Sequence, residues 1–121
     1  MAEKKFYTHD GVVQSAELSA DYAAAEKFDS ARVGKLGVYY RDGLRTKYIA
    51  FDTVERAFIR VQEVTGRMCC GCVNFAYYRL VLVSGGVECA DIMSESEKAM
   101  DSALAKIHEN APAIEIGVAQ Q

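Results

Sequence analysis

The sequence predicts an α+β domain in which an antiparallel β-meander, partly closed into a barrel, is capped by an amphipathic C-terminal helix and preceded by an extra helix. Runs of alternating apolar residues, separated by short turn sequences, occupy residues 33–93, as in consecutive antiparallel strands. Apolar residues at helical spacing follow in 94–109. The chain has 121 residues, 50% hydrophobic and 26% charged, which suits one folded domain over 1–121 and excludes extensive disorder.

The N-terminal extension, residues 1–30, precedes the sheet and capping helix, which are expected over 33–111. Residues 6–8 are a candidate short strand, and residues 15–28 predict a helix. The apolar stripe of that helix is thin, and its members at helical spacing are Leu18, Tyr22, Ala25 and Phe28. We therefore expect this helix to lie on the surface of another element.

Five strands are expected in the meander, and most of the turns between them contain glycine. Asp42-Gly43 is typical of a type I′ hairpin turn, in which both central residues have positive φ, and Ser84-Gly85-Gly86 is a second turn. Residues 66–74 predict a loop. The expected strands are Leu36–Arg41, Leu44–Phe51, Val54 or Arg56 to Val64, Phe75–Val83 and Val87–Met93.

The last helix has a clear start and one apolar face. Ser94 and Glu97 have the spacing of a capping box, in which each side chain accepts a hydrogen bond from the backbone N–H of the other. The stripe expected to cover the sheet consists of Met100, Ala103, Leu104 and Ile107. Asn110 and Pro112 end the helix, and the tail at 113–117 is expected to be extended.

The order of these elements resembles the pleckstrin-homology-like (PH-like) domains of bacteria. The motifs that carry the resemblance are Leu36-Gly-Val-Tyr-Tyr-Arg-Asp-Gly, Lys47-Tyr-Ile-Ala-Phe-Asp-Thr-Val and Arg79-Leu-Val-Leu-Val, with the Gly86 turn and the final helix. The resemblance covers 33–111 and implies a seven-stranded barrel in a family without an assigned activity. The two further strands would come from residues 6–8, 31–33 or 113–117.

Four cysteines suggest a candidate metal or redox site. Cys69, Cys70 and Cys72 form a C-x-x-C loop, and Cys89 is expected to lie near them if its strand is adjacent. A second ligand pair is absent from the sequence, so zinc would lack a certain fourth ligand. A redox C-x-x-C usually opens a helix, whereas this one lies between strands. Small thiols in a tight turn are the alternative interpretation.

A basic hairpin is the second candidate site. Lys35, Arg45 and Lys47 lie around the Asp42-Gly43 turn in the sequence. Phosphoinositide-binding PH domains carry a Lys on one strand and Lys/Arg-x-Arg on the next, and the resemblance implies an anionic lipid or phosphate ligand here. This chain has lysine as the second of the pair, which lacks the bidentate fork of arginine. A solvated strand face is the alternative interpretation.

No catalytic motif is found, so the function expected is that of a non-enzymatic binding or scaffold module. Its partner would be another protein or a second copy, because Tyr39-Tyr40 and Tyr77-Tyr78 each place a ring on both faces of a strand. Coverage of one face by the N-terminal helix would explain the second ring equally well. The net charge of −3 argues against nucleic acid. No export signal or spanning segment is recognised, so the cytoplasm and free thiols are expected.

Overall fold

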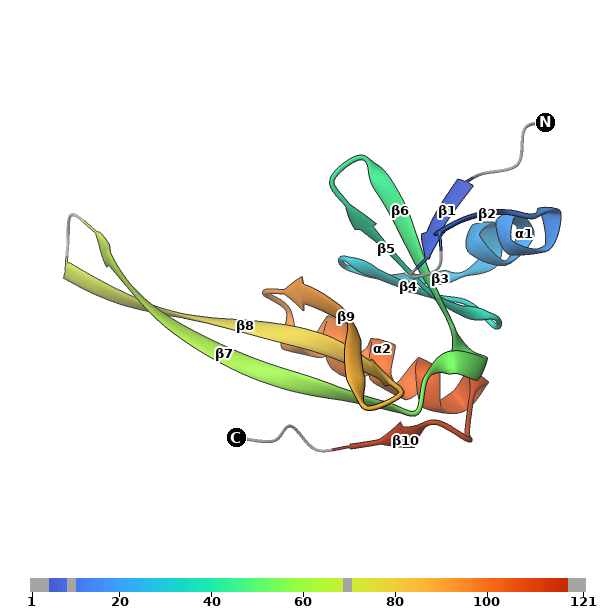
Figure 1. Ribbon diagram of the computed structural model, residues 1–121. Coiled ribbons are helices and arrows are strands. Elements are labelled where there is room, and N and C mark those ends of the chain that lie inside the picture. Colours follow the sequence, from blue (N-terminus) through green and yellow to red (C-terminus); the bar gives the residue numbers. More distant parts are fainter. Residues whose placement is uncertain (1–4, 9–10, 69–70, 118–121) are drawn as a thin grey trace.

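The computed structural model describes residues 5–8, 11–68 and 71–117, with the side chains of all these residues except 64–68 and 71–75. The α+β class is confirmed: two mixed sheets pack with two helices (Figure 1). The larger sheet has six strands in the order β2-β1-β6-β5-β4-β3. Its strands are β1 (Lys5–Thr8), β2 (Gly11–Gln14), β3 (Glu26–Phe28), β4 (Ala31–Val33), β5 (Gly37–Asp42) and β6 (Arg45–Ala50).

The smaller sheet contains the longest strands of the molecule. Its order is β10-β7-β8-β9, in which β7, β8 and β9 form an antiparallel meander and β10 lies parallel to β7. A short 3₁₀ turn, η1 (Phe51–Thr53), connects the two sheets. The strands are β7 (Arg56–Met68), β8 (Gly71–Ser84), β9 (Val87–Ser94) and β10 (Glu115–Ile116).

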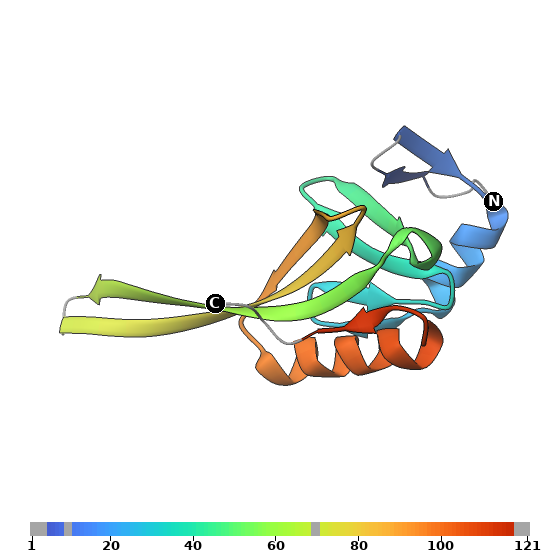
Figure 2. The same cartoon turned by 60° about the horizontal axis from the view of Figure 1, so that its bottom comes forward.

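The helices cover different surfaces. Helix α1 (Ala16–Ala24) lies on one face of the six-stranded sheet, where Leu18 packs with Phe6, Tyr39 and Tyr48. Helix α2 (Glu97–Asn110) contacts strands of both sheets and lies beside β10 (Figure 2). Neither helix in the described part of the chain has the length and hydropathy that a membrane-spanning helix requires.

The main core lies between the two sheets and α2. As expected from the sequence, one face of α2 is buried; its fully buried side chains are Met100, Ala103 and Ile107. They meet the inner faces of both sheets. The strand residues of this core include Ala31, Val33, Val38, Ile49, Ala57, Leu80, Leu82, Ala90 and Ile92. The amphipathic helix therefore caps the sheets as the sequence predicts.

The expectation of a partly closed barrel is wrong, because over the described residues the strands form two separate sheets. After β6 the chain turns through η1, and β7 starts a new sheet instead of pairing with β6. The N-terminal residues supply the remaining strands of the larger sheet. Strand β1 joins β6 in parallel with one registered pair, Tyr7 opposite Lys47, and β3 and β4 extend the other side.

The end of α1 and the start of α2 differ from expectation, and each difference has a local cause. The predicted helix over 15–28 ends at Ala24, because Ala25 is extended and residues 26–28 pair with β4. Helix α2 is capped by Ser96, whose hydroxyl accepts a hydrogen bond from the N–H of Ala99 at 3.1 Å. The Ser94 hydroxyl instead accepts a bond from the N–H of Ser96.

The hairpin turns show where positive φ is needed. In the turn from β5 to β6, Gly43 has φ 65° and Asp42 does not have positive φ, so the type I′ expectation is wrong there. In the turn from β8 to β9, Gly85 and Gly86 have φ of 59° and 78°, which fits the predicted glycine turn.

Candidate functional site

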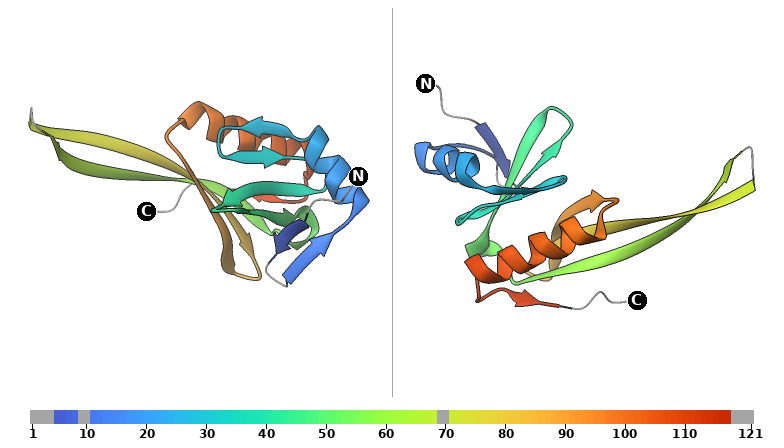
Figure 3. Two further views of the ribbon diagram at one scale, coloured as in Figure 1. Left: turned by 90° about the horizontal axis from the view of Figure 1, so that it is seen from above. Right: turned by 180° about the vertical axis from the view of Figure 1, so that it is seen from behind.

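A two-stranded ribbon extends from the smaller sheet, where the sequence predicted a loop at 66–74. We call its described parts, Gln62–Met68 of β7 and Gly71–Tyr77 of β8, the arm. Strand β9 pairs with β8 only from Tyr78 onward, and β10 pairs with β7 only at Arg56 and Ala57. Among the described residues the arm therefore has no third strand, and Figure 3 shows it projecting away from both sheets.

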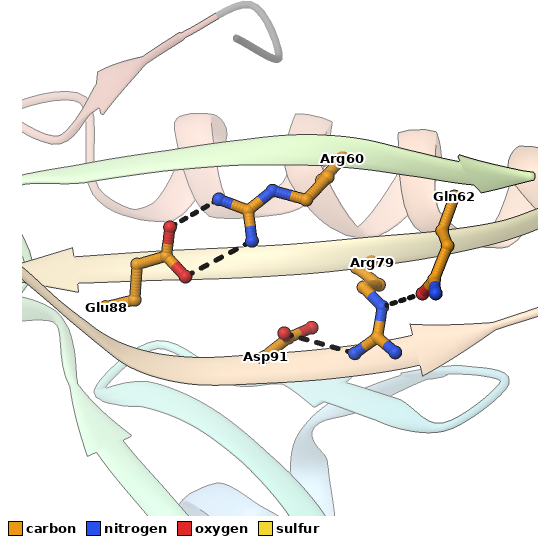
Figure 4. Close-up of polar contacts among 5 residues, drawn as sticks. All are labelled: Arg60, Gln62, Arg79, Glu88 and Asp91. Atoms are coloured by element: carbon orange, nitrogen blue, oxygen red, sulfur yellow. Dashed lines mark hydrogen bonds and ion pairs between the residues drawn. The ribbon is translucent and has the colours of Figure 1, made fainter. Parts of the chain in front are cut away.

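We call the place where the arm begins the root. On its outer face, polar side chains link the three strands (Figure 4); they are Arg60, Gln62, Arg79, Glu88 and Asp91. Arg60 of β7 forms an ion pair with Glu88 of β9 across the intervening strand. Arg79 Nη1 of β8 forms an ion pair with Asp91 Oδ2 at 3.1 Å, and Arg79 Nε donates a hydrogen bond to Gln62 Oε1 at 2.7 Å. Three strands are thus cross-linked where the arm begins.

Electrostatics and apolar packing strengthen this root. The hydrogen bond and charge of Arg60 lower the pKa of the Glu88 carboxyl, which is therefore ionised at neutral pH. Next to it, Phe58, Val81 and Val83 form a small apolar cluster. The guanidinium carbons of Arg56 and Arg60 lie 5.3 and 5.5 Å from the centre of the Phe58 ring, within cation–π range.

The inner face of the same strands loses its cover as the arm begins. Ile59 and Tyr78 still pack against the main core. Val61 lies two residues after Ile59 on the same face of β7, and it is 50% exposed. Among the described side chains, the chain's own core therefore ends at the root.

The two edges of the arm differ in composition. The β8 segment Gly71–Tyr77 contains no charged residue, whereas the β7 segment Gln62–Met68 contains Glu63 and Arg67. Folded proteins usually protect an open edge strand with charge, proline or a covering element. The β8 edge has no charge and no proline, so it suits pairing with another strand.

Of the predicted cysteine site, only the backbone of Cys72 lies in the described part of the arm, where it pairs with Arg67. Cys69 and Cys70 lie outside the described residues, as does the side chain of Cys72. Along β8, Cys72 and Leu82 are ten positions apart, which at about 3.3 Å per residue separates them by roughly 33 Å. Since Cys89 lies beside Leu82, its thiol is too distant to share a ligand set with Cys72.

Cys89 is instead a half-buried free thiol. Its Sγ donates a hydrogen bond to the Leu82 carbonyl at 3.3 Å, and burial raises the pKa of the thiol. A raised pKa disfavours the reactive thiolate. The described side chains include no group of three or more His, Cys, Asp or Glu that could hold a metal ion.

The basic residues of the predicted hairpin site do not converge. Lys47 Nζ pairs with Asp42 at 3.1 Å, and the Arg45 guanidinium lies over the Tyr7 ring at 5.0 Å. Lys35 precedes the other end of β5, because Gly37 pairs with Ala50 there while the turn lies at Asp42 and Arg45. Along the chain, Lys35 precedes Tyr40, the partner of Lys47, by five residues and Asp42, the partner of Arg45, by seven, so its charge lies apart from the other two.

For the pair Tyr39-Tyr40, coverage of one sheet face by the N-terminal helix explains the second ring. The Tyr39 ring is fully buried, and the centres of the Phe6, Tyr22 and Tyr48 rings lie 5.0–5.3 Å from its own. Tyr22 comes from α1, so the N-terminal helix covers this face of the sheet. Tyr40, on the opposite face, packs partly buried against the main core.

A family model described as "Domain of unknown function (DUF6709)" matches residues 2–121. Neither the curated proteins nor the solved structures give a significant match. These findings give no support to a PH-like relationship. Because the family model spans almost the entire sequence, the chain belongs to the DUF6709 family.

Proposed function

We propose that this protein is a non-enzymatic binding module that associates with a second copy of itself through the β8 edge of the arm. The observation that carries this function is a two-stranded ribbon whose β8 edge, Gly71–Tyr77, has no charged residue and no third strand beside it among the described residues. The arm supports a binding role independently of any PH-like relationship.

A ribbon of this length gains little stability by itself. Seven residues of each strand lie in the arm, which at about 3.3 Å per residue is a reach of roughly 23 Å. An isolated two-stranded hairpin is marginally stable in water, and three or more strands are usually needed. Pairing with another strand would supply the missing hydrogen bonds and cover, as in other cases of β-strand addition.

A second copy fits the β8 edge for reasons of symmetry. When a strand edge pairs with the same edge of an identical chain, the two strands run antiparallel about a two-fold axis, and each contact occurs twice. The result would be a four-stranded sheet with β7 of each copy on the outside. Because β7 carries Glu63 and Arg67 in the arm, the outer edges are protected and growth stops at the dimer.

The oligomeric state tests this function directly. In reducing buffer, light scattering coupled to size exclusion should give twice the chain mass of 13.3 kDa at high concentration. A variant in which Asn-Gly joins Gln62 to Tyr77 removes the arm but keeps the root, and its mass should be that of one chain. A monomeric parent protein, or a shortened variant that remains dimeric, would refute self-association through the arm.

Three further variants separate edge pairing from other causes of association. Asn74→Lys with Ala76→Lys puts charge on the β8 edge and should weaken the dimer, whereas the matched Asn74→Gln with Ala76→Ser should not. Replacing Cys69, Cys70 and Cys72 by serine should leave the dimer intact. Loss of the dimer in the serine variant would favour a metal or disulfide bridge at the cysteine loop instead.

A further inference from the structure

We propose that a pocket on the α1 side of the six-stranded sheet binds the phosphate group of a small phosphate monoester. The pocket has a volume of about 260 Å³. Its lining includes three cationic side chains, Lys27, Arg32 and Arg41, beside the rings of Tyr22 and Tyr39. This site is separate from the arm and contains none of the basic residues that the sequence suggested.

The strand register brings the three cations together. Lys27 of β3 pairs directly with Arg32 of β4, and Arg32 pairs with Tyr39 of β5. Arg41 lies two residues beyond Tyr39, on the same face of β5. Directly opposed residues lie about 5 Å apart and diagonal ones about 7–8 Å, so one phosphate can contact side chains from all three strands.

The lining of the pocket includes three cationic side chains and one carboxylate, that of Asp29, so its net charge is positive. In the described part of the chain, Lys27, Arg32 and Arg41 form no ion pair. Asp29 also lines the pocket, but its carboxylate accepts a hydrogen bond from the Ser94 hydroxyl. Like charges directly opposed in a sheet are destabilising, so the pair Lys27 and Arg32 favours an anion between them.

Arg32 is already held in position. Its guanidinium carbon lies 4.5 Å from the centre of the Tyr22 ring, and Nη1 donates to the Tyr22 carbonyl at 3.4 Å. An arginine has five N–H donors, so most remain available for a ligand. Lys27 and Arg41 are exposed at the pocket rim, where they can close on the phosphate.

The lining favours a phosphate that carries an organic substituent. Thr46, 6% exposed, and the buried Tyr39 form the inner wall, and Tyr22 provides an aromatic surface. Arginine recognises phosphate with two parallel hydrogen bonds, which a monoester dianion accepts well. The substituent would pack against the tyrosine rings. A soluble phosphate monoester and the headgroup of phosphatidic acid share this chemistry.

Phenyl phosphate titrated into the protein, followed by amide NMR shifts, tests the site. Saturable shifts should appear around Arg32 and Arg41. Arg41→Gln should weaken binding about tenfold or more, since a hydrogen bond to a charged group is lost. Arg45→Gln, which removes a cation outside the pocket, should leave binding unchanged. Equal weakening by both variants, or no effect of Arg41→Gln, would overturn the proposal.

A second variant raises affinity rather than lowering it. Asp29 has φ 57°, a conformation that asparagine also adopts readily. Asp29→Asn therefore keeps the backbone and an acceptor for Ser94, but removes the negative charge from the pocket and should tighten binding. Unchanged or weaker binding in this variant would contradict an anion site.

Co-sedimentation with phosphatidylcholine vesicles containing phosphatidic acid distinguishes the sources of the phosphate. Binding to vesicles alone, weakened by Arg41→Gln, would assign the site to a lipid headgroup. Binding of phenyl phosphate alone would assign it to a soluble monoester. The absence of saturable binding to either probe would overturn the site.

Discussion

Replacing Asp21 by alanine should destabilise the fold more than any other single surface substitution in α1. The Asp21 carboxylate accepts three hydrogen bonds from β5 and the segment that leads into it. Two come from the backbone N–H groups of Lys35 and Leu36, at 2.9 and 3.1 Å, and one from the Tyr39 hydroxyl at 2.6 Å. This one side chain joins α1 to the sheet that it covers.

The expected magnitude follows from those three bonds. A hydrogen bond to a charged group contributes about 1.5–3 kcal/mol, so three bonds set a ceiling of roughly 9 kcal/mol. Water can replace Asp21 at the exposed Lys35 N–H, but the buried Tyr39 hydroxyl would lose its partner. We therefore expect Asp21→Ala to lower the free energy of unfolding by about 3–5 kcal/mol.

Urea denaturation followed by circular dichroism measures this loss. Asp101→Ala is a matched control, because Asp101 is an exposed acid on α2 and should change the free energy of unfolding by less than about 0.5 kcal/mol. A loss below about 1 kcal/mol in Asp21→Ala, or one equal to that of the control, would refute the view that Asp21 anchors α1.

Two other predictions concern the cap of α2 and alkaline stability. Ser96→Ala removes the N-cap bond to Ala99 and should cost about 1 kcal/mol in thermal or urea unfolding; an unchanged stability would show that Ser96 is not the cap. Burial, with Asp52 nearby, raises the pKa of Tyr48 to about 12. The contribution of the protonated Tyr48 hydroxyl to the free energy of unfolding is therefore complete below pH 10. It is lost between about pH 10 and 12, because Tyr48 in the unfolded state releases its proton at a lower pH. Denaturation at pH 9–11.5 should show this decline, and Tyr48→Phe should make it shallower.

The middle and end of the chain were predictable because their signals are long and periodic. Strands β5 to β9 show alternation over six or more residues, and the Gly85-Gly86 turn has the required positive φ. The buried face of α2 follows from its helical spacing. The capping residue was misplaced by two positions because Ser94 and Ser96 offer the same chemistry, and only the backbone path decides between them.

The N-terminal strands and the separation of the two sheets could not be predicted from periodic signals in the sequence. Strands β3 and β4 have three residues each, which is too short for a periodic signal. Closure of a barrel depends on which edges pair, and the single registered pair between β1 and β6 has no local signature. For the same reason the pocket cations Lys27, Arg32 and Arg41 were missed: two of them lie on those short strands.

The arm shows how a local signal can be overruled by its surroundings. Gly66, Gly71 and the cysteines favoured a loop, yet the register of β7 and β8 continues unbroken from Arg56–Val83 to Met68–Gly71. The root explains this extension, because pairing that is already nucleated at Arg60 and Arg79 adds each further pair without a new loop-closure cost. What the root does not explain is an uncharged edge on a ribbon that has no third strand among the described residues. In a monomer that edge would be a liability, whereas in a two-fold dimer it becomes the interior of a sheet.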